Sequence, residues 1–171
     1  MIVVLRGKPG VGKTTLVSKV MKEFEAVGFY TKEVRNSQGR RVGFDIVLHN
    51  GRTFVLARKS EGKPRVGKYR VFVEELEKAL EMLGNVEGKI LFVDEIGKME
   101  SLSLKFQRWL FESAEKATFL LATGSHVDIP LLRKFMDEFN PVIYSVSERN
   151  RNELVGTLKN LIRETLEKSS F

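Results

Sequence analysis

Two hydrophobic patterns alternate along this chain. Continuous apolar runs, which are typical of strands buried on both faces, occur at residues 2–5, 89–93, 118–122 and 142–146. Apolar residues at helical spacing occur at residues 14–27, 73–83, 102–110, 128–139 and 150–166. Gly28 is expected to end the first of these helices. The alternation predicts an α/β fold in which one parallel sheet is covered by helices on both faces.

One segment, residues 28–70, departs from this alternation. Antiparallel strands are predicted there at residues 29–34, 42–49 and 52–57. The Asn50-Gly51 dipeptide between the last two predicts a two-residue type I′ turn. Residues 58–70 are predicted to form a loop, either a plain connector or a mobile lid over phosphates. The sheet is therefore expected to carry an antiparallel β-hairpin insert.

The most informative stretch is the glycine-rich loop after the first apolar run. It reads G-K-P-G-V-G-K-T and leads directly into a helix, which matches the phosphate-binding pattern G-x-x-x-x-G-K-[ST]. Glycines let successive N–H groups surround an anion, and the helix adds its own unpaired N–H groups. Lys13 is expected to reach the β- and γ-phosphates. The predicted phosphate-binding residues are Gly7, Lys8, Pro9, Gly10, Val11, Gly12, Lys13, Thr14 and Thr15.

Two adjacent carboxylates supply a second half to this site. Asp94 follows a buried strand, at the strand end where ligands bind in parallel sheets, and is predicted to hold Mg²⁺ together with Thr14. Glu95 is predicted to polarise the attacking water, and so is a candidate catalytic residue beside Lys13. The alternative for Glu95 is an ion pair with Lys98 or a cap on the next helix.

The sequence gives less direct evidence for the residues that contact the nucleobase. The run Asp94-Glu95-Ile96-Gly97 also fits the D-x-x-G of GTPases, and its residues are included in the predicted nucleotide site. However, the N-K-x-D tetrapeptide of guanine-specific enzymes does not occur in the sequence, so guanine specificity is disfavoured. The candidate base contacts follow the last strand and are Arg149, Asn150 and Arg151, with a plain helix N-cap as the alternative for Asn150.

Composition excludes several classes of protein. The 171 residues suit one domain spanning 1–171 and contain no cysteine, which excludes disulfides and thiolate catalysis. No apolar stretch of transmembrane length and no export signal is apparent, so a cytoplasmic protein without a membrane partner is expected. Residues 28–70 contain eleven Lys or Arg and three Asp or Glu. This basic segment either attracts a polyphosphate or nucleic acid, or is simply a solvated face.

These stretches together resemble the small cancer-related nucleoside-triphosphatase family of thermophilic prokaryotes and animals. The resemblance rests on G-K-P-G-V-G-K-T-T at 7–15, G-F-Y-T-K-E-V-R at 28–35, R-R-V-G-F-D-I-V at 40–47, V-G-K-Y-R-V at 66–71 and D-E-I-G-K-M-E at 94–100. It implies a P-loop fold of the RecA-like (ASCE) branch, with the 118–122 strand between the P-loop strand and the Walker B strand. Thr123, Ser125 and His126 depart from the family pattern, so a role in sensing the γ-phosphate is not carried over to them.

The resemblance also implies an activity. It implies Mg²⁺-dependent hydrolysis of nucleoside triphosphates, ATP and GTP among them, to diphosphate and phosphate with little base discrimination. Carried over to this sequence, it supports phosphate binding at 7–15, magnesium at Thr14 and Asp94, and catalysis by Glu95. Two alternatives are a small nucleotide or metabolite kinase and a nucleic-acid-binding ATPase. The second is less favoured because Phe44 and Phe54 fit hairpin packing rather than a stacking platform.

Overall fold

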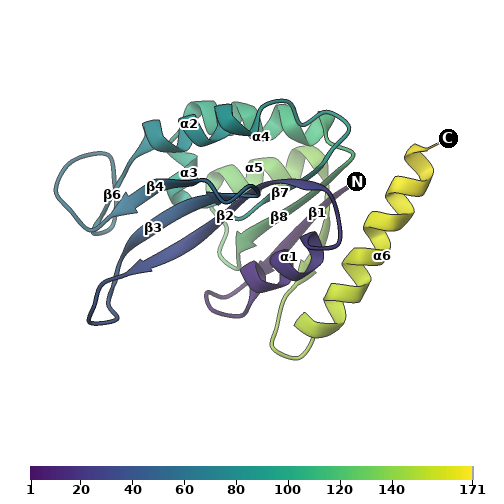
Figure 1. Ribbon diagram of the computed structural model, residues 1–171, viewed down its shortest axis with the longest axis horizontal. Helices are drawn as coiled ribbons and strands as arrows, with labels where there is room; N and C mark the ends of the chain where they lie inside the picture. The colour runs from purple at the N-terminus through teal and green to yellow at the C-terminus, as the bar shows by residue number, and fades with distance from the viewer. Residues whose placement is uncertain (171) are drawn as a thin grey trace.

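A nine-stranded mixed sheet runs through the computed structural model, which describes residues 1–170 (Figure 1). Its strand order is β5-β6-β4-β3-β2-β7-β8-β1-β9. The strands are β1 (Ile2–Gly7), β2 (Ala26–Arg35), β3 (Arg41–Leu48), β4 (Thr53–Arg58), β5 (Arg65–Val66), β6 (Tyr69–Val71), β7 (Ile90–Val93), β8 (Phe119–Ser125) and β9 (Val142–Ser145). The helices are α1 (Lys13–Met21), α2 (Val73–Leu83), α3 (Lys98–Ser101), α4 (Leu104–Lys116), α5 (Pro130–Phe139) and α6 (Arg151–Ser169).

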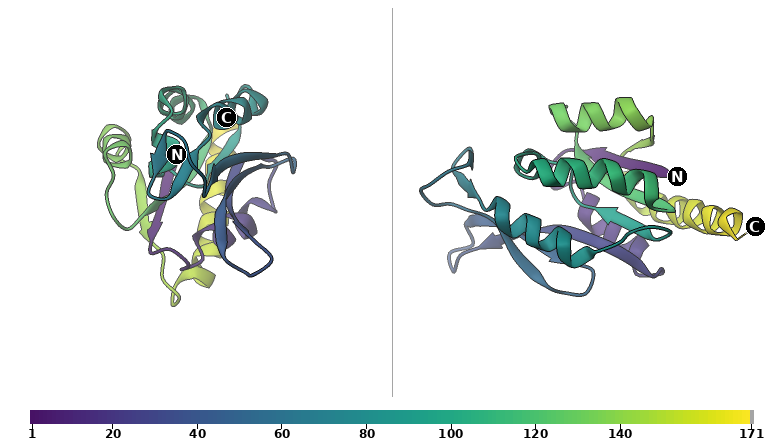
Figure 2. Two further views of the ribbon diagram at one scale, coloured as in Figure 1. Left: turned by 90° about the vertical axis from the view of Figure 1, so that its left-hand side faces the viewer. Right: turned by 90° about the horizontal axis from the view of Figure 1, so that it is seen from above.

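Five strands, β2-β7-β8-β1-β9, are parallel to their neighbours and form one half of the sheet. Helices α1 and α6 cover one face of this half, and α4 and α5 cover the other (Figure 2). Strand β8 lies between β1, which leads into the P-loop, and β7, which ends at Asp94. This is the strand order that the resemblance implies. The predicted parallel sheet with helices on both faces is confirmed.

The other half, β3, β4, β6 and β5, is antiparallel and forms the predicted insert. The prediction of a loop throughout 58–70 is wrong, because β5 and β6 pair there as a small hairpin. The predicted type I′ turn is also wrong. The N–H of Gly51 bonds the carbonyl of Leu48, and Gly51, unlike Asn50, has a positive φ of 89°. This is a three-residue connection in which a type I turn precedes a left-handed glycine.

The first helix is shorter than the sequence pattern predicts. α1 ends at Met21, and Val27, which was expected on the helix, pairs with Leu91 in β2. Gly28 does not end a helix but lies inside β2 opposite Phe92, with a φ of 148°. A methyl group at Gly28 would lie 2.0 Å from the Phe92 carbonyl oxygen, so only glycine allows the two strands to approach at this position.

The helix predicted at 102–110 begins two residues later in the structure, as α4. Ser103 is its N-cap and accepts a hydrogen bond from the Phe106 N–H. Trp109 on α4 packs against Phe29 and Phe106 at ring-centroid distances of 6.3 and 5.8 Å, as expected of a core residue. Within residues 1–170, no helix combines the length and apolar character needed to cross a membrane.

Candidate active site

The turn between β1 and α1 is built to receive an anion. Gly10 and Gly12 have φ values of 78° and 105°, which residues with a Cβ rarely adopt. α1 begins without a side-chain cap and without an acidic residue in its first turn, so its first N–H groups are available to a phosphate. Lys13 Nζ donates to the carbonyls of Gly7 and Lys8 and thus lies over the loop. Burial lowers the pKa of Lys13, partly offset by the charges of Glu95 and Asp94.

Asp94 is held at the end of β7 by hydroxyl groups. Thr14 Oγ1 donates to one carboxylate oxygen of Asp94 at 2.6 Å, and Thr123 Oγ1 donates to the other at 2.6 Å. Thr31 Oγ1 donates to the Asp94 carbonyl at 2.7 Å. The side chain is only 4% exposed. Burial raises the pKa of Asp94, while the bonds from Thr123 and Thr14 act in the opposite direction.

These oxygens fit a magnesium ion. Mg²⁺ prefers hard oxygen ligands and is usually bound by one or two protein groups together with water and phosphates. Thr14 and Asp94 line one cavity, and the Thr14 hydroxyl lies within hydrogen-bond distance of the nearer Asp94 oxygen. No group of three or more His, Cys, Asp or Glu side chains that could hold a metal occurs within residues 1–170.

Glu95 faces the same cavity, which has a volume of about 480 Å³ and also contains Lys13, Thr14 and Asp94. Burial, and after it the charge of Asp94, raises the pKa of Glu95. Neither alternative considered for Glu95 occurs in the described part of the chain. No ion pair joins it to Lys98, and α3 has Gly97 at its N-cap without a side-chain cap. Its carboxylate therefore remains available to a bound substrate.

The insert adds side chains that the sequence did not single out. Arg41 on β3, with Glu33, Thr31 and Phe44, lines the same cavity from the side of the insert. Its guanidinium donates to Glu33 at 3.2 Å and to the Tyr69 hydroxyl at 3.0 Å. A signal for part of this set was present in the sequence, because Thr31 and Glu33 alternate on one face of a strand predicted to lie near the site.

Not all predicted site residues lie in this cavity. Ile96 is 1% exposed, and its N–H donates to the Thr123 carbonyl, so it is a core residue beside the site. Ser125 lines the cavity, whereas His126 lies elsewhere. Thr123, left without a role in the sequence analysis, positions Asp94. Further residues of the predicted set that lie outside this cavity are Gly7, Lys8, Val11, Gly97, Arg149, Asn150 and Arg151.

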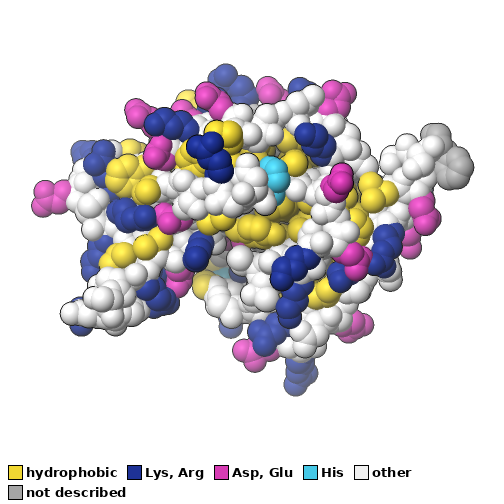
Figure 3. Space-filling model, viewed as in Figure 1, with side chains coloured by type: hydrophobic (Ala, Val, Ile, Leu, Met, Phe, Trp, Pro, Cys, Tyr) yellow, Lys and Arg dark blue, Asp and Glu magenta, His cyan; other side chains and the backbone are white. Residues whose placement is uncertain are grey.

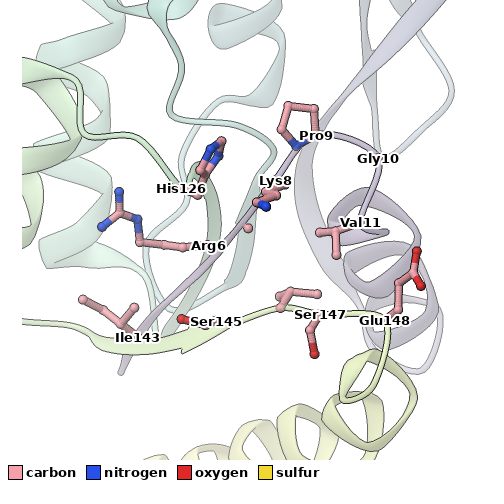
Figure 4. Close-up of a pocket in the computed structure, with 12 residues that line it drawn as sticks. Arg6, Lys8, Pro9, Gly10, Val11, His126, Ile143, Ser145, Ser147 and Glu148 are labelled. Atoms are coloured by element: carbon pink, nitrogen blue, oxygen red, sulfur yellow. The ribbon is translucent and has the colours of Figure 1, made fainter.

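A larger cavity, about 650 Å³, lies on the other side of the P-loop (Figure 4). The loop residues Lys8 to Val11 form one side, and Ser145 to Glu148 form another. Arg6 and His126 stand beside them (Figure 4). This cavity adjoins the phosphate-binding loop, is not lined by Asp94 or Glu95, and has the volume of a small-molecule site.

The three candidate base contacts differ in position. Arg151 donates to the Val11 carbonyl at 3.2 Å and, with Gly12 and Thr15, lines a small cavity beside the P-loop. Asn150 instead braces its own loop, since its amide bonds the Ser147 N–H at 2.8 Å and the Ser145 carbonyl at 2.7 Å. It stands at the N-cap position of α6 but makes no side-chain cap bond. Arg149 lines none of the cavities described here.

Comparison with known proteins decides the family. The sequence profile of the NTPase family, described as NTPase, matches residues 2–159. The chain belongs to this NTPase family. A curated relative from Archaeoglobus fulgidus, the nucleoside-triphosphatase THEP1, is 40% identical over 167 residues, which cover 95% of this chain and 99% of the relative. The predicted family is thus confirmed.

Two solved structures of this NTPase family are similar to the chain throughout its length. The crystal structure of THEP1 from Aquifex aeolicus has a TM-score of 0.80 at 30% identity and covers 94% of this chain and 98% of its own. The solution structure of a human cancer-related nucleoside triphosphatase has a TM-score of 0.81 at 31% identity, with 95% and 97% covered. They confirm the predicted P-loop fold and support the predicted enzyme class, a nucleoside-triphosphatase.

Proposed function

We propose that this protein hydrolyses nucleoside triphosphates to the diphosphate and phosphate, with Mg²⁺ and with little discrimination between bases. One observation carries the proposal: Lys13, the Thr14–Asp94 pair and Glu95 line a single cavity at the carboxyl end of the parallel strands. The names of the relatives agree with this activity. A phosphate-binding loop alone would only bind a triphosphate. A carboxylate beside it, here Glu95, can also activate a water molecule for hydrolysis.

The residues of this cavity have distinct roles in the proposed reaction. The P-loop N–H groups and Lys13 bind the β- and γ-phosphates and offset the charge that develops on them. Thr14 and Asp94 would hold Mg²⁺, which when bound neutralises phosphate charge. Glu95 orients a water molecule and takes one of its protons as the water oxygen bonds the γ-phosphorus. The bond from that phosphorus to the bridging oxygen breaks, and the diphosphate leaves with its electron pair.

Low base discrimination is supported by the kind of contact that a base could make beside the P-loop. The larger cavity is lined by Arg6, P-loop residues up to Val11, His126, Ile143 and the segment Ser145 to Glu148. Of these side chains, Arg6 is already bonded to Asp128 and to the Ser125 carbonyl. Arg151 beside Gly12 would pack on a purine or a pyrimidine alike. We therefore expect similar hydrolysis of ATP, GTP, CTP and UTP.

The substitution Glu95→Gln tests the proposal. It keeps the shape of the side chain but removes its ability to accept a proton, so turnover should fall by about 10²–10⁴-fold while triphosphate binding persists. Phosphate release measures turnover, and equilibrium titration with a fluorescent triphosphate measures binding. Glu87→Gln on the exposed surface is the matched control. Full turnover by the Glu95 variant would refute the assigned role.

A further inference from the structure

A separate cavity of about 350 Å³ adjoins the triphosphate cavity at Glu95. The two share Thr31, Phe44, Glu95 and Ser125, but the smaller cavity contains none of the P-loop residues. Its apolar walls come from three parts of the fold, namely the insert (Leu56, Val66), α3 and the segment before it (Met99, Ile96) and the segment after β8 (Val127, Ile129). Gly97, the exposed Lys98 and the buried Glu100 complete the lining. The proposed hydrolysis does not require this space.

Two carboxyl groups lie together at one end of the cavity. A methyl group placed on Gly97 would lie 2.9 Å from Glu100 Oε2 and 3.1 Å from Glu95 Oε1, so both oxygens flank the same small residue. Glu100 is 2% exposed, and within residues 1–170 its Oε2 has no hydrogen-bond partner. Burial, and after it the charge of Glu95, raises the pKa of Glu100 well above its ordinary value.

An unpaired, buried carboxyl oxygen is costly in a folded protein, because it loses its bonds to water without gaining others. Glu100 lies on a helix of only four residues, where an apolar side chain of similar size would fill the same volume at lower cost. Such groups are characteristic of sites where a ligand supplies the missing partner. The combination of apolar walls and a few convergent polar groups is that of a small-molecule site.

We propose that this cavity binds a second ligand, a small molecule with an apolar body and a protonated primary amine that is directed toward Glu95 and Glu100. The amine supplies the donor that Glu100 lacks, and the body contacts Phe44, Met99 and Val66. The consequence for activity rests on the proposed function. An amine beside Glu95 takes the carboxylate away from the attacking water, so an occupied cavity slows hydrolysis.

Binding is tested first without nucleotide, so that the result does not depend on hydrolysis. The probe is benzylamine, and the signal is the methyl resonance of Met99 in protein labelled at its methionine methyl groups. Met136, on α5 and outside the cavity lining, is the internal control. Benzylamine should shift the Met99 resonance saturably, benzyl alcohol should bind at least fivefold more weakly, and benzoate should cause no shift. Absence of a saturable Met99 shift with benzylamine would overturn the proposal.

Two variants locate the binding. Glu100→Gln keeps the shape of the side chain and should weaken benzylamine binding at least tenfold, whereas unchanged affinity would contradict the assignment. Val66→Phe fills the cavity from β5 and should abolish the Met99 shift. An unchanged Met136 resonance and a cooperative melt will show that each variant is folded.

The effect on activity is measured last, as phosphate release from ATP at saturating benzylamine. Release should fall at least fivefold in the original chain and remain constant in Val66→Phe. Unchanged release in the original chain would contradict the position of the amine beside Glu95. Binding without any ATP hydrolysis would refute the proposed function instead, and hydrolysis without benzylamine binding would refute only this inference.

Discussion

The parallel half of the sheet and the antiparallel insert contribute to the candidate site in different ways. All four residues of β7 and six of the seven in β8 are buried, whereas β3 and β4 contain exposed, partly buried and buried positions. The reason is that helices cover both faces of the parallel half, while α2 packs against β3 and β4 on one face. The insert therefore has a face free to direct side chains toward the P-loop.

This difference extends to the charged groups. In the parallel half, Asp94 is buried and fixed by the hydroxyls of Thr14 and Thr123. In the insert, Arg41 is exposed and is held by an ion pair with Glu33 and by the Tyr69 hydroxyl. Other basic side chains of the insert spread over the end of the molecule formed by β3, β4 and β6 (Figure 3). The parallel half thus holds its groups rigidly, and the insert holds its groups by contacts that a substrate can replace.

The largest effect is expected from Lys13→Ala in the parallel half. The variant loses the one ammonium group that lies over the P-loop, so kcat/KM for ATP should fall by about 10³-fold or more. Steady-state phosphate release measures this loss. Lys22→Ala, on the exposed turn after α1, should behave as the original chain. A loss of less than tenfold would show that the main-chain N–H groups suffice.

The next effect concerns the pairing of β2 with β7 inside the parallel half. Gly28→Ala places a Cβ against the Phe92 carbonyl where β2 pairs with β7, so we expect destabilisation by about 3 kcal/mol or more. For a chain of this size that corresponds to a fall in Tm of roughly 10 °C. Gly39→Ala, where a Cβ would meet open space but φ is also positive, separates the steric effect from the conformational one. Equal losses in both variants would contradict the close-approach explanation.

A smaller effect is expected from Arg41→Ala in the insert. An arginine that stabilises transferring phosphate can contribute about 10³-fold or more, but Arg41 must first leave Glu33 and Tyr69. We therefore expect kcat to fall by about 10–100-fold with little change in KM. The neighbouring Arg40→Ala is the matched control, since Arg40 lies outside the cavity lining. If both substitutions leave kcat unchanged, catalysis belongs to the parallel half alone.

The smallest effect is a gain in stability. Replacing Glu100 by Met removes a buried carboxyl whose Oε2 has no partner within residues 1–170, and should stabilise the fold by about 1 kcal/mol, or roughly 2–4 °C in Tm. The pKa of Glu100 is raised in the folded state, so the original chain loses stability as the pH rises through that value. The difference between variant and original should therefore be larger at about pH 8 than at about pH 4.5. Melting curves at both values measure it, and a destabilised Glu100→Met at about pH 8 would contradict this account.

Much of the parallel half was predictable because its signals are local. The glycine loop, the apolar strand before it and the carboxylate after β7 each occupy a few consecutive residues. The errors arose where a local signal had two meanings. Val27 fits helical spacing, yet it belongs to β2, where it pairs with Leu91 of β7 and packs against the core. The two-residue strand β5 left no pattern long enough to detect.

The sequence by itself determined the α/β class, the phosphate-binding loop, and the identity of Lys13, Thr14, Asp94 and Glu95 as the candidate chemical groups. Those features depend on residue type and short spacing, which the chain carries wherever it folds. Tertiary structure alone decided that Thr123 holds Asp94, that Arg41 reaches the same cavity, and that Glu100 is buried with no partner for its Oε2 among residues 1–170. Each of these depends on which distant strands become neighbours, and that is set by the packing of the whole sheet rather than by any one segment.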